Sequence, residues 1–125
     1  MKTRVSKRWS FDAAHKLPNH DGKCRQLHGH TYTVTVVVEG EVNALDGRAQ
    51  EGMVIDFAIL DTFWDQVKPD VDHRFLNESL DVDITTSEYI AYYLFGYFTA
   101  ALGELVQVVS VRVSETPATY AEVIA

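Results

Sequence analysis

The segment His28-Gly29-His30-Thr31-Tyr32-Thr33-Val34-Thr35-Val36-Val37-Val38-Glu39 has the strongest β-strand pattern in the chain, because it is rich in Thr, Tyr and Val. Threonine at every second position alternates with larger apolar side chains, which is the period of two of a strand. The same period places His28 and His30 on one face, with their Cα atoms about 6.5 Å apart. We therefore predict a strand over residues 28–39 that presents two imidazoles to one ion.

The segments on either side of this strand predict further strands and two helices. Alternating patterns indicate further strands over residues 4–11, 106–115 and 120–124, and residues 52–57 form a short extended piece. A first helix is expected from an N-cap at Asp56 to Pro69, where proline stops it. A capping box from Thr85 to Glu88 opens a second helix, which ends at Gly103.

The order of these elements is strand, strand, helix, helix, strand, strand, which is typical of an α+β fold. Two antiparallel hairpins make one sheet, and the helical pair between them covers one face. Such a sheet has two unpaired edge strands, which natural proteins cover or pair. An oligomer that joins sheets edge to edge would satisfy both edges.

Composition limits the classes of function. At 125 residues, 46% of them hydrophobic and 23% charged, the chain is expected to be a single domain over 1–125. It contains no apolar run long enough for a transmembrane helix and no signal-peptide pattern. A net charge of −7 argues against nucleic-acid and membrane partners, and a single cysteine fits a reducing, cytoplasmic location.

Three histidines and the only cysteine lie close together in the sequence. His15, His28 and His30 are a sufficient ligand set for catalytic zinc, because three imidazoles leave one coordination position open. Any one of them alone would more often be an ordinary histidine. Cys24 lies four residues before His28 with Lys23 and Arg25 beside it, and nearby cations lower a thiol pKa. A lone cysteine is otherwise usually a small buried apolar residue.

The motifs together resemble those of the 6-pyruvoyl-tetrahydropterin synthase family. The matching blocks occur in family order and cover most of the chain: Phe11-Asp12-Ala13-Ala14-His15, Cys24-x-x-x-His28-Gly29-His30-x-Tyr32, Gly52-Met53-Val54-Ile55-Asp56-Phe57, Asp72-His73-x-x-Leu76-Asn77, Thr86-Ser87-Glu88 and Glu115. A lone His-Gly-His would be weak evidence, whereas six blocks in order are strong. Many members have proline at the position of Thr85.

The resemblance implies the tunnelling fold, or T-fold, with a ββααββ subunit whose sheets join around a barrel. Trimers of such subunits commonly stack as a hexamer with active sites at the subunit interfaces. It further implies one zinc ion per subunit, bound by His15, His28 and His30. The implied catalytic residues are Cys24, Asp72 and His73, with the Asp-His pair supplied by a neighbouring subunit. Glu115 would anchor the pterin through two parallel hydrogen bonds, helped by Thr86 and Ser87.

Each of these residues also has a simpler interpretation. Asp72 and His73 would be a helix-end acid and a surface histidine, and Glu115 a surface residue at a strand end. Thr86 and Ser87 would cap a helix, which is compatible with pterin binding. Three cations near the cluster could contact a triphosphate or could be solvated surface charges: Lys16, Lys23 and Arg25. Asp56 is expected to be structural.

The family's substrate is 7,8-dihydroneopterin triphosphate. Three residues separate Cys24 from His28, as in the carboxy-forming branch, whereas the pyruvoyl-forming enzymes have a longer insertion. That branch releases acetaldehyde and triphosphate, leaves 6-carboxy-5,6,7,8-tetrahydropterin, and feeds 7-deazaguanine and queuosine synthesis. The alternatives are a pyruvoyl-forming or other pterin-processing enzyme on the same fold, or a non-catalytic zinc-binding oligomeric module. A zinc hydrolase is less consistent, because no HExxH-type glutamate accompanies the ligands.

Overall fold

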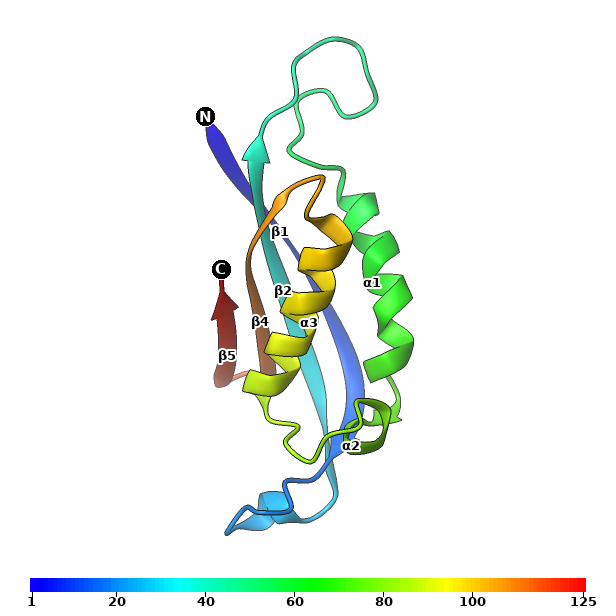
Figure 1. Ribbon diagram of the computed structural model, residues 1–125, viewed down its shortest axis with the longest axis vertical. Helices are drawn as coiled ribbons and strands as arrows, with labels where there is room; N and C mark the ends of the chain where they lie inside the picture. Colours follow the sequence, from blue (N-terminus) through cyan, green and yellow to red (C-terminus); the bar gives the residue numbers. More distant parts are fainter.

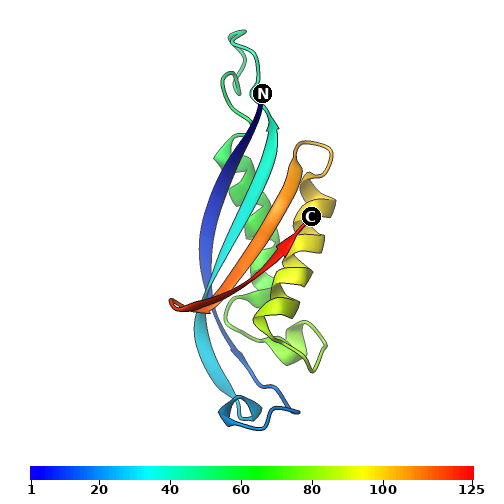
Figure 2. The same ribbon diagram turned by 90° about the vertical axis from the view of Figure 1, so that its left-hand side faces the viewer.

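The computed structural model describes residues 1–125 and contains one five-stranded sheet with helices packed on one of its faces (Figures 1 and 2). The long strands β1 and β2 form the first hairpin, and β4 and β5 form the last. In chain order the elements are β1 (Lys2–His15), a 3₁₀ turn (Lys23–Arg25), β2 (His28–Glu41), α1 (Phe57–Val71), β3 (Arg74–Phe75), α2 (Leu76–Ser79), α3 (Ser87–Leu102), β4 (Gln107–Thr116) and β5 (Thr119–Ile124).

The strands lie in the order β3-β1-β2-β4-β5, with antiparallel pairing throughout except for the short parallel contact of β3 with β1. Figure 2 shows α1 and α3 side by side along the same face of the sheet. The opposite face carries no helix. The predicted α+β arrangement of two hairpins with helices between them is therefore confirmed, including helices on one face only.

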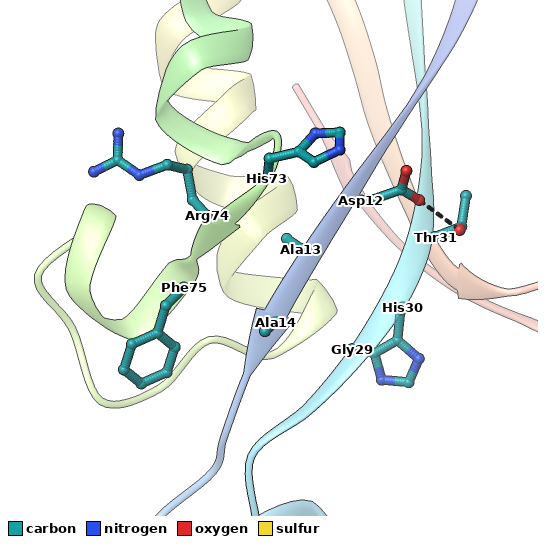
Figure 3. Close-up of a pocket in the computed structure, with 9 residues that line it drawn as sticks. All are labelled: Asp12, Ala13, Ala14, Gly29, His30, Thr31, His73, Arg74 and Phe75. Carbon is teal, nitrogen blue, oxygen red and sulfur yellow. Dashed lines mark hydrogen bonds between the residues drawn. The ribbon is translucent and has the colours of Figure 1, made fainter.

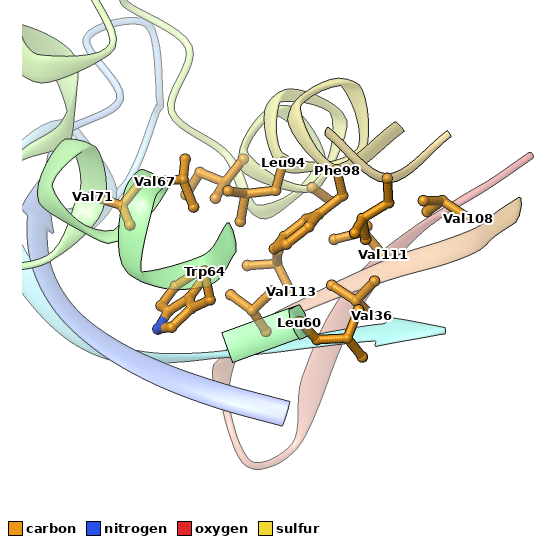
Figure 4. Close-up of a cluster of buried hydrophobic side chains, with 14 of the residues drawn as sticks. Val36, Leu60, Trp64, Val67, Val71, Leu94, Phe98, Val108, Val111 and Val113 are labelled. Atoms are coloured by element: carbon orange, nitrogen blue, oxygen red, sulfur yellow. The ribbon is translucent and has the colours of Figure 1, made fainter. Parts of the chain in front are cut away.

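Apolar side chains from both layers meet between the helices and the sheet. Leu60 and Trp64 from α1, and Leu94 and Phe98 from α3, are at most 3% exposed. They pack over alternate valines of β2 and β4, as Figure 4 shows for Val36 and Val113. Burial of this kind contributes about 25 cal/mol per Å² of apolar surface, so this layer is the main source of stability for the site at one end of the sheet.

Helix α1 begins as predicted but ends later. The Asp56 side chain accepts a hydrogen bond from the Ala58 N–H at 2.9 Å, which confirms it as the N-cap. The prediction that Pro69 stops the helix is wrong, because α1 continues to Val71 with Pro69 inside its last turn. Proline there removes only one hydrogen bond, and the fully buried Val71 holds the last turn against the core.

Helix α3 begins one residue later than the predicted capping box. Thr86, not Thr85, is its N-cap, and its hydroxyl accepts from the Tyr89 N–H at 3.2 Å. Thr85 is instead fully buried beside His15, which takes its side chain out of the capping position. The helix ends at Gly103 as expected. None of the helices combines the length and apolar character needed to cross a membrane.

Three short elements were not predicted, namely the 3₁₀ turn at Lys23–Arg25 and two elements after α1, and one expected piece is absent. The segment after α1 adds β3 to the edge of β1 and then makes the single turn α2, whereas the sequence pattern indicated no strand or helix there. Residues 52–55 form a turn rather than an extended piece. Val54 and Ile55 are nevertheless buried, so this turn fixes the start of α1 by packing without joining the sheet.

Candidate functional site

The register of β1 and β2 brings the three predicted histidine ligands together. His15 lies opposite His28 across the two strands, and His30 lies opposite Ala13, two residues further along the pair. Residues opposite each other on antiparallel strands point to the same face. One ring nitrogen from each of the three histidines lies within 4.8 Å of those of the other two. The predicted convergence of these side chains on one point is therefore observed.

Hydrogen bonds to the backbone orient two of the imidazoles. His15 Nδ1 lies 2.8 Å from the Thr85 carbonyl oxygen, and His28 Nδ1 lies 2.7 Å from the Gln26 carbonyl oxygen. A carbonyl oxygen only accepts, so in both rings Nδ1 carries the proton and Nε2 of the neutral ring is left with its lone pair. This pattern, an Nδ1–H held by a carbonyl, is the one that prepares a histidine to ligate metal through Nε2.

The two free nitrogens then face each other. His15 Nε2 and His28 Nε2 are 3.1 Å apart, and neither has a proton to share while both rings are neutral. Two lone pairs at this distance repel each other unless a cation lies between them. Two nitrogens bound at about 2.0–2.1 Å to one tetrahedral zinc ion are about 3.3 Å apart. The donor set and its spacing therefore fit a metal ion.

His15 is the most deeply buried of the three, with 1% of its surface exposed. Burial lowers the pKa of His15, and the hydrogen bond to the Thr85 carbonyl opposes that effect only in part. The neighbouring His28 lowers the His15 pKa further, because two imidazolium ions would repel each other. The ring is thus kept neutral, which is the form that ligates metal.

Glu115, near the end of β4, lies against the histidine cluster. Its Oε2 atom is 3.7 Å from His30 Nε2 and 3.9 Å from His15 Nε2. The family resemblance assigns Glu115 a role in pterin binding, but the sequence did not predict its contact with the imidazole rings. Its side chain remains 32% exposed, so part of the carboxylate is available to a ligand.

A small cavity of about 110 Å³ joins several of the predicted residues. Cys24 enters it from the 3₁₀ turn that precedes β2, and His15 forms the side nearest the other histidines. The cavity therefore brings a thiol, two carboxylates and two hydroxyls to one side of the histidine cluster. Its lining residues are His15, Leu17, Cys24, Thr86, Ser87, Glu88 and Glu115.

The loop that carries Cys24 is tied back to β1. The Leu17 N–H donates to the Cys24 carbonyl oxygen at 2.7 Å, which closes the hairpin loop around residues 18–23. The Cys24 thiol is half-buried and forms no disulfide. The three cations of this region remain exposed at the molecular surface: Lys16, Lys23 and Arg25.

Tyr32 lies beside the histidine cluster, and the sequence placed it in the strand and in the motif that begins at Cys24 without giving it a role. It is fully buried, packs its ring on Phe11 and meets His15 and His30 edge-on. Its hydroxyl has no hydrogen-bond partner within the chain. Burial raises the pKa of Tyr32, and the charge of Glu115 raises it further. The alternation His28, His30, Tyr32 along β2 is the signal that could have identified it.

Asp72 and His73 form a second polar cluster together with Asp12. His73 Nδ1 lies 3.0 Å from Asp72 Oδ2, so the predicted pair is formed. The Asp12 N–H donates to Asp72 Oδ1 at 3.0 Å, and this bond holds the pKa of Asp72 below its usual range. Figure 3 shows the His73 ring pointing toward Asp12 beside a cavity of about 590 Å³ that Ala14 and Gly29 also line.

Within one chain this pair does not share the cavity of Cys24. Asp12 is exposed between the buried Phe11 and Ala13, so it lies on the face of β1 opposite to that of His15. His73 itself is 78% exposed and has a φ of 56°, a left-handed conformation that costs about 1–3 kcal/mol. Its N–H holds that conformation by donating to the Asp12 carbonyl oxygen.

Sequence comparisons relate this chain to enzymes of pterin chemistry. The family model "6-pyruvoyl tetrahydropterin synthase" matches residues 4–125. A 6-carboxy-5,6,7,8-tetrahydropterin synthase of Synechocystis sp. is 45% identical over 73% of this chain and 70% of its own. A dihydroneopterin monophosphate aldolase of Pyrococcus furiosus is 40% identical over 75% of this chain and 73% of its own.

Solved structures agree with this relationship. The 6-pyruvoyl tetrahydropterin synthase of Caenorhabditis elegans superposes with a TM-score of 0.85 at 28% identity, covering 100% of this chain and 96% of that one. The family model thus matches nearly the full length of the chain. The same chain has the sheet order and the histidine cluster described above. The chain belongs to the 6-pyruvoyl-tetrahydropterin synthase family.

Proposed function

We propose that this protein converts 7,8-dihydroneopterin triphosphate to 6-carboxy-5,6,7,8-tetrahydropterin, with release of acetaldehyde and triphosphate, in 7-deazaguanine and queuosine synthesis. The observation that carries this proposal is the pair of facing Nε2 atoms of His15 and His28, 3.1 Å apart, beside the cavity that holds Cys24. The 45% identity to a protein named for this product supports the choice of branch.

His15, His28 and His30 would hold one Zn²⁺ per subunit. When bound, zinc supplies Lewis-acid chemistry: it polarises side-chain oxygens of the substrate, acidifies the neighbouring C–H and stabilises the negative charge that develops. The backbone carbonyls that accept from His15 and His28 keep both rings oriented for this task. Three neutral nitrogens and no thiolate ligand favour zinc over an iron–sulfur cluster.

Cys24 is the proposed base, as a thiolate that removes a proton from the substrate side chain. Its position in one cavity with His15 and Glu115 supports this role. Glu115 would accept two N–H bonds from the pterin ring, and Thr86 and Ser87 would contact the ring edge. A thiol with this function must stay reduced, so we propose a cytoplasmic location.

Asp72 and His73 would return and relay protons. Asp72 accepts from His73 Nδ1, which leaves His73 Nε2 as the nitrogen that exchanges protons with a ligand. Because the pair lies outside the Cys24 cavity of its own chain, we propose that it completes the site of a neighbouring subunit in a hexamer built from two trimers. The unpaired edge of β5 and the short edge strand β3 support sheet-to-sheet assembly.

Complementation between variants tests this shared site. Cys24→Ala and His73→Ala each remove one half of it, so each variant alone should lose most turnover. When the two are unfolded together and refolded as mixed oligomers, some interfaces regain both halves and activity should return. Two inactive variants that stay inactive after mixing, although mixed oligomers form, would place both halves within one chain.

Product identification tests the reaction itself. Zinc-loaded protein is incubated with 7,8-dihydroneopterin triphosphate, and the pterin product is identified by mass spectrometry. We expect 6-carboxytetrahydropterin from the parent chain and from His20→Ala, whose histidine lies in an exposed loop, but none from His28→Ala. A 6-pyruvoyl product would place the protein in the other branch.

The 40% identity to a dihydroneopterin monophosphate aldolase makes aldol cleavage of a dihydroneopterin phosphate the second candidate function. That reaction removes the side chain as an aldehyde and leaves a hydroxymethyl group on the pterin, so the same mass measurement distinguishes it. A non-catalytic zinc-binding module would instead leave every pterin phosphate unchanged and would give Cys24 ordinary thiol reactivity.

A further inference from the structure

Thr85 is the only threonine in the core, and no role was assigned to its side chain above. It is fully buried and lies next to the proposed metal ligand His15. Its carbonyl oxygen is 2.8 Å from His15 Nδ1, and its hydroxyl oxygen is 3.2 Å from the same nitrogen. The single N–H of His15 is therefore shared between two oxygens of one residue.

The hydroxyl of Thr85 also has acceptors to which it can donate its own proton. The Asn77 side-chain oxygen lies 3.2 Å away, and the Lys16 carbonyl oxygen lies 3.4 Å away. Since the hydroxyl can donate to Asn77 while it accepts from His15, both of its hydrogen-bonding functions are satisfied. The Thr85 hydroxyl therefore has both a donor and an acceptor within the chain, as buried polar groups require when no water reaches them.

Asn77 extends the network to the backbone on both sides of the site. Its side chain accepts from the Lys16 N–H at 3.0 Å and donates to the Lys16 carbonyl at 2.8 Å. It also donates to the Asp83 carbonyl oxygen at 3.2 Å, two residues before Thr85. The chain after His15 and the chain before Thr85 are thus held by one amide, and the Thr85 hydroxyl links that amide to the imidazole.

We propose that the Thr85 hydroxyl is a positioning residue for the metal: together with Asn77 it fixes the orientation and Nδ1–H tautomer of His15 and so raises metal affinity. This inference rests on the ligand role of His15 in the proposed function. Hydrogen-bond partners of metal-bound histidines contribute about 10–100-fold to metal affinity. The Thr85 carbonyl still accepts from His15 without the hydroxyl, so the expected effect lies near 10-fold.

The test is zinc affinity, measured in competition with a chromophoric chelator and without any pterin. Thr85→Val keeps the shape of the side chain and removes the hydroxyl, and it should bind zinc about 10-fold more weakly than the parent. Thr85→Ser restores the hydroxyl and should return to within about 2-fold of the parent. Thr62→Val is the matched control, because Thr62 donates to the Ala58 carbonyl on the exposed side of α1. It should bind zinc as the parent does.

The structural effect of each change is followed separately by the melting temperature of the metal-free protein. A zinc affinity of Thr85→Val equal to that of the parent overturns the inference, as does a Thr85→Ser variant as weak as Thr85→Val. Failure of the parent to bind zinc overturns it as well. A parent that binds zinc but leaves dihydroneopterin triphosphate unchanged contradicts only the proposed function, because no step of this assay uses that substrate.

Discussion

The proposed zinc site at the histidine cluster predicts how much the ion should stabilise the fold. The folded chain presents His15, His28 and His30 within 4.8 Å of one another, whereas the unfolded chain does not hold them together. An ion that binds only the folded state at 100 times its Kd stabilises it by about 2.7 kcal/mol. For a chain of 125 residues, an unfolding entropy of about 2.1 cal/mol/K per residue converts this into a rise of about 10 °C in melting temperature.

The assay is thermal unfolding with and without zinc, followed by circular dichroism. His28→Ala removes one of the two facing nitrogens and should lose most of the 10 °C rise. His20→Ala is the matched control, since it removes an exposed imidazole outside the cluster and should keep the full rise. The reasoning is refuted if zinc stabilises His28→Ala as much as the parent, because the ion would then be bound elsewhere.

Three further predictions follow from individual contacts. Cys24→Ala should keep stoichiometric zinc by metal analysis and lose most turnover, because the thiol lies in the cavity but not among the imidazoles; full turnover would remove the thiol from the mechanism. In the metal-free protein, burial lowers the pKa of His15 from 6.5, so the unfolded state binds more protons and the urea midpoint should fall as the pH drops below about 6.5. His15→Asn should make the urea midpoint less dependent on pH, and an unchanged pH dependence in this variant would show that His15 is not its source. Asp56→Ala should destabilise the fold by about 1 kcal/mol in urea titration, because the cap on the Ala58 N–H is lost, and a neutral result would show that packing of Ile55 alone sets the start of α1.

Local patterns were sufficient to predict the four long strands and the convergence of the histidines. The period of two in β2 places His28 and His30 on one face, and hairpin pairing adds His15. Asp56 and Gly103 are helix boundaries whose residue types are typical of helix starts and ends. These features depend on neighbours a few residues away, so the sequence alone was enough to locate them.

Features that depend on distant contacts were missed or misplaced. Thr85 was predicted as a helix cap because its local pattern fits one, but contact with a histidine 70 residues away draws it into the core. Pro69 was predicted to end α1, and burial of Val71 overrides it. The role of Asp12 in holding Asp72 and His73 comes from backbone groups of β1, which carry no side-chain signal in the sequence.

The same contrast between local pattern and distant contact separates the Cys24 cavity from the Asp72–His73 pair. Cys24, Thr86, Ser87 and Glu115 could be grouped by motif, and the fold places them around one cavity. The Asp72–His73 pair was also identified by motif, but its distance from that cavity follows from the parallel contact of β3 with β1, which no local pattern indicates. The sequence motifs thus identify candidate site residues, whereas the fold decides which of them lie together in one chain.

The central claim is carbon–carbon cleavage in the substrate side chain, and acetaldehyde is its direct signature. Acetaldehyde can be followed by its reduction with NADH and alcohol dehydrogenase while zinc-loaded protein consumes 7,8-dihydroneopterin triphosphate. The account predicts one acetaldehyde and one triphosphate for each pterin consumed. Triphosphate release with no acetaldehyde, and with the side-chain carbons still on the pterin, would contradict it.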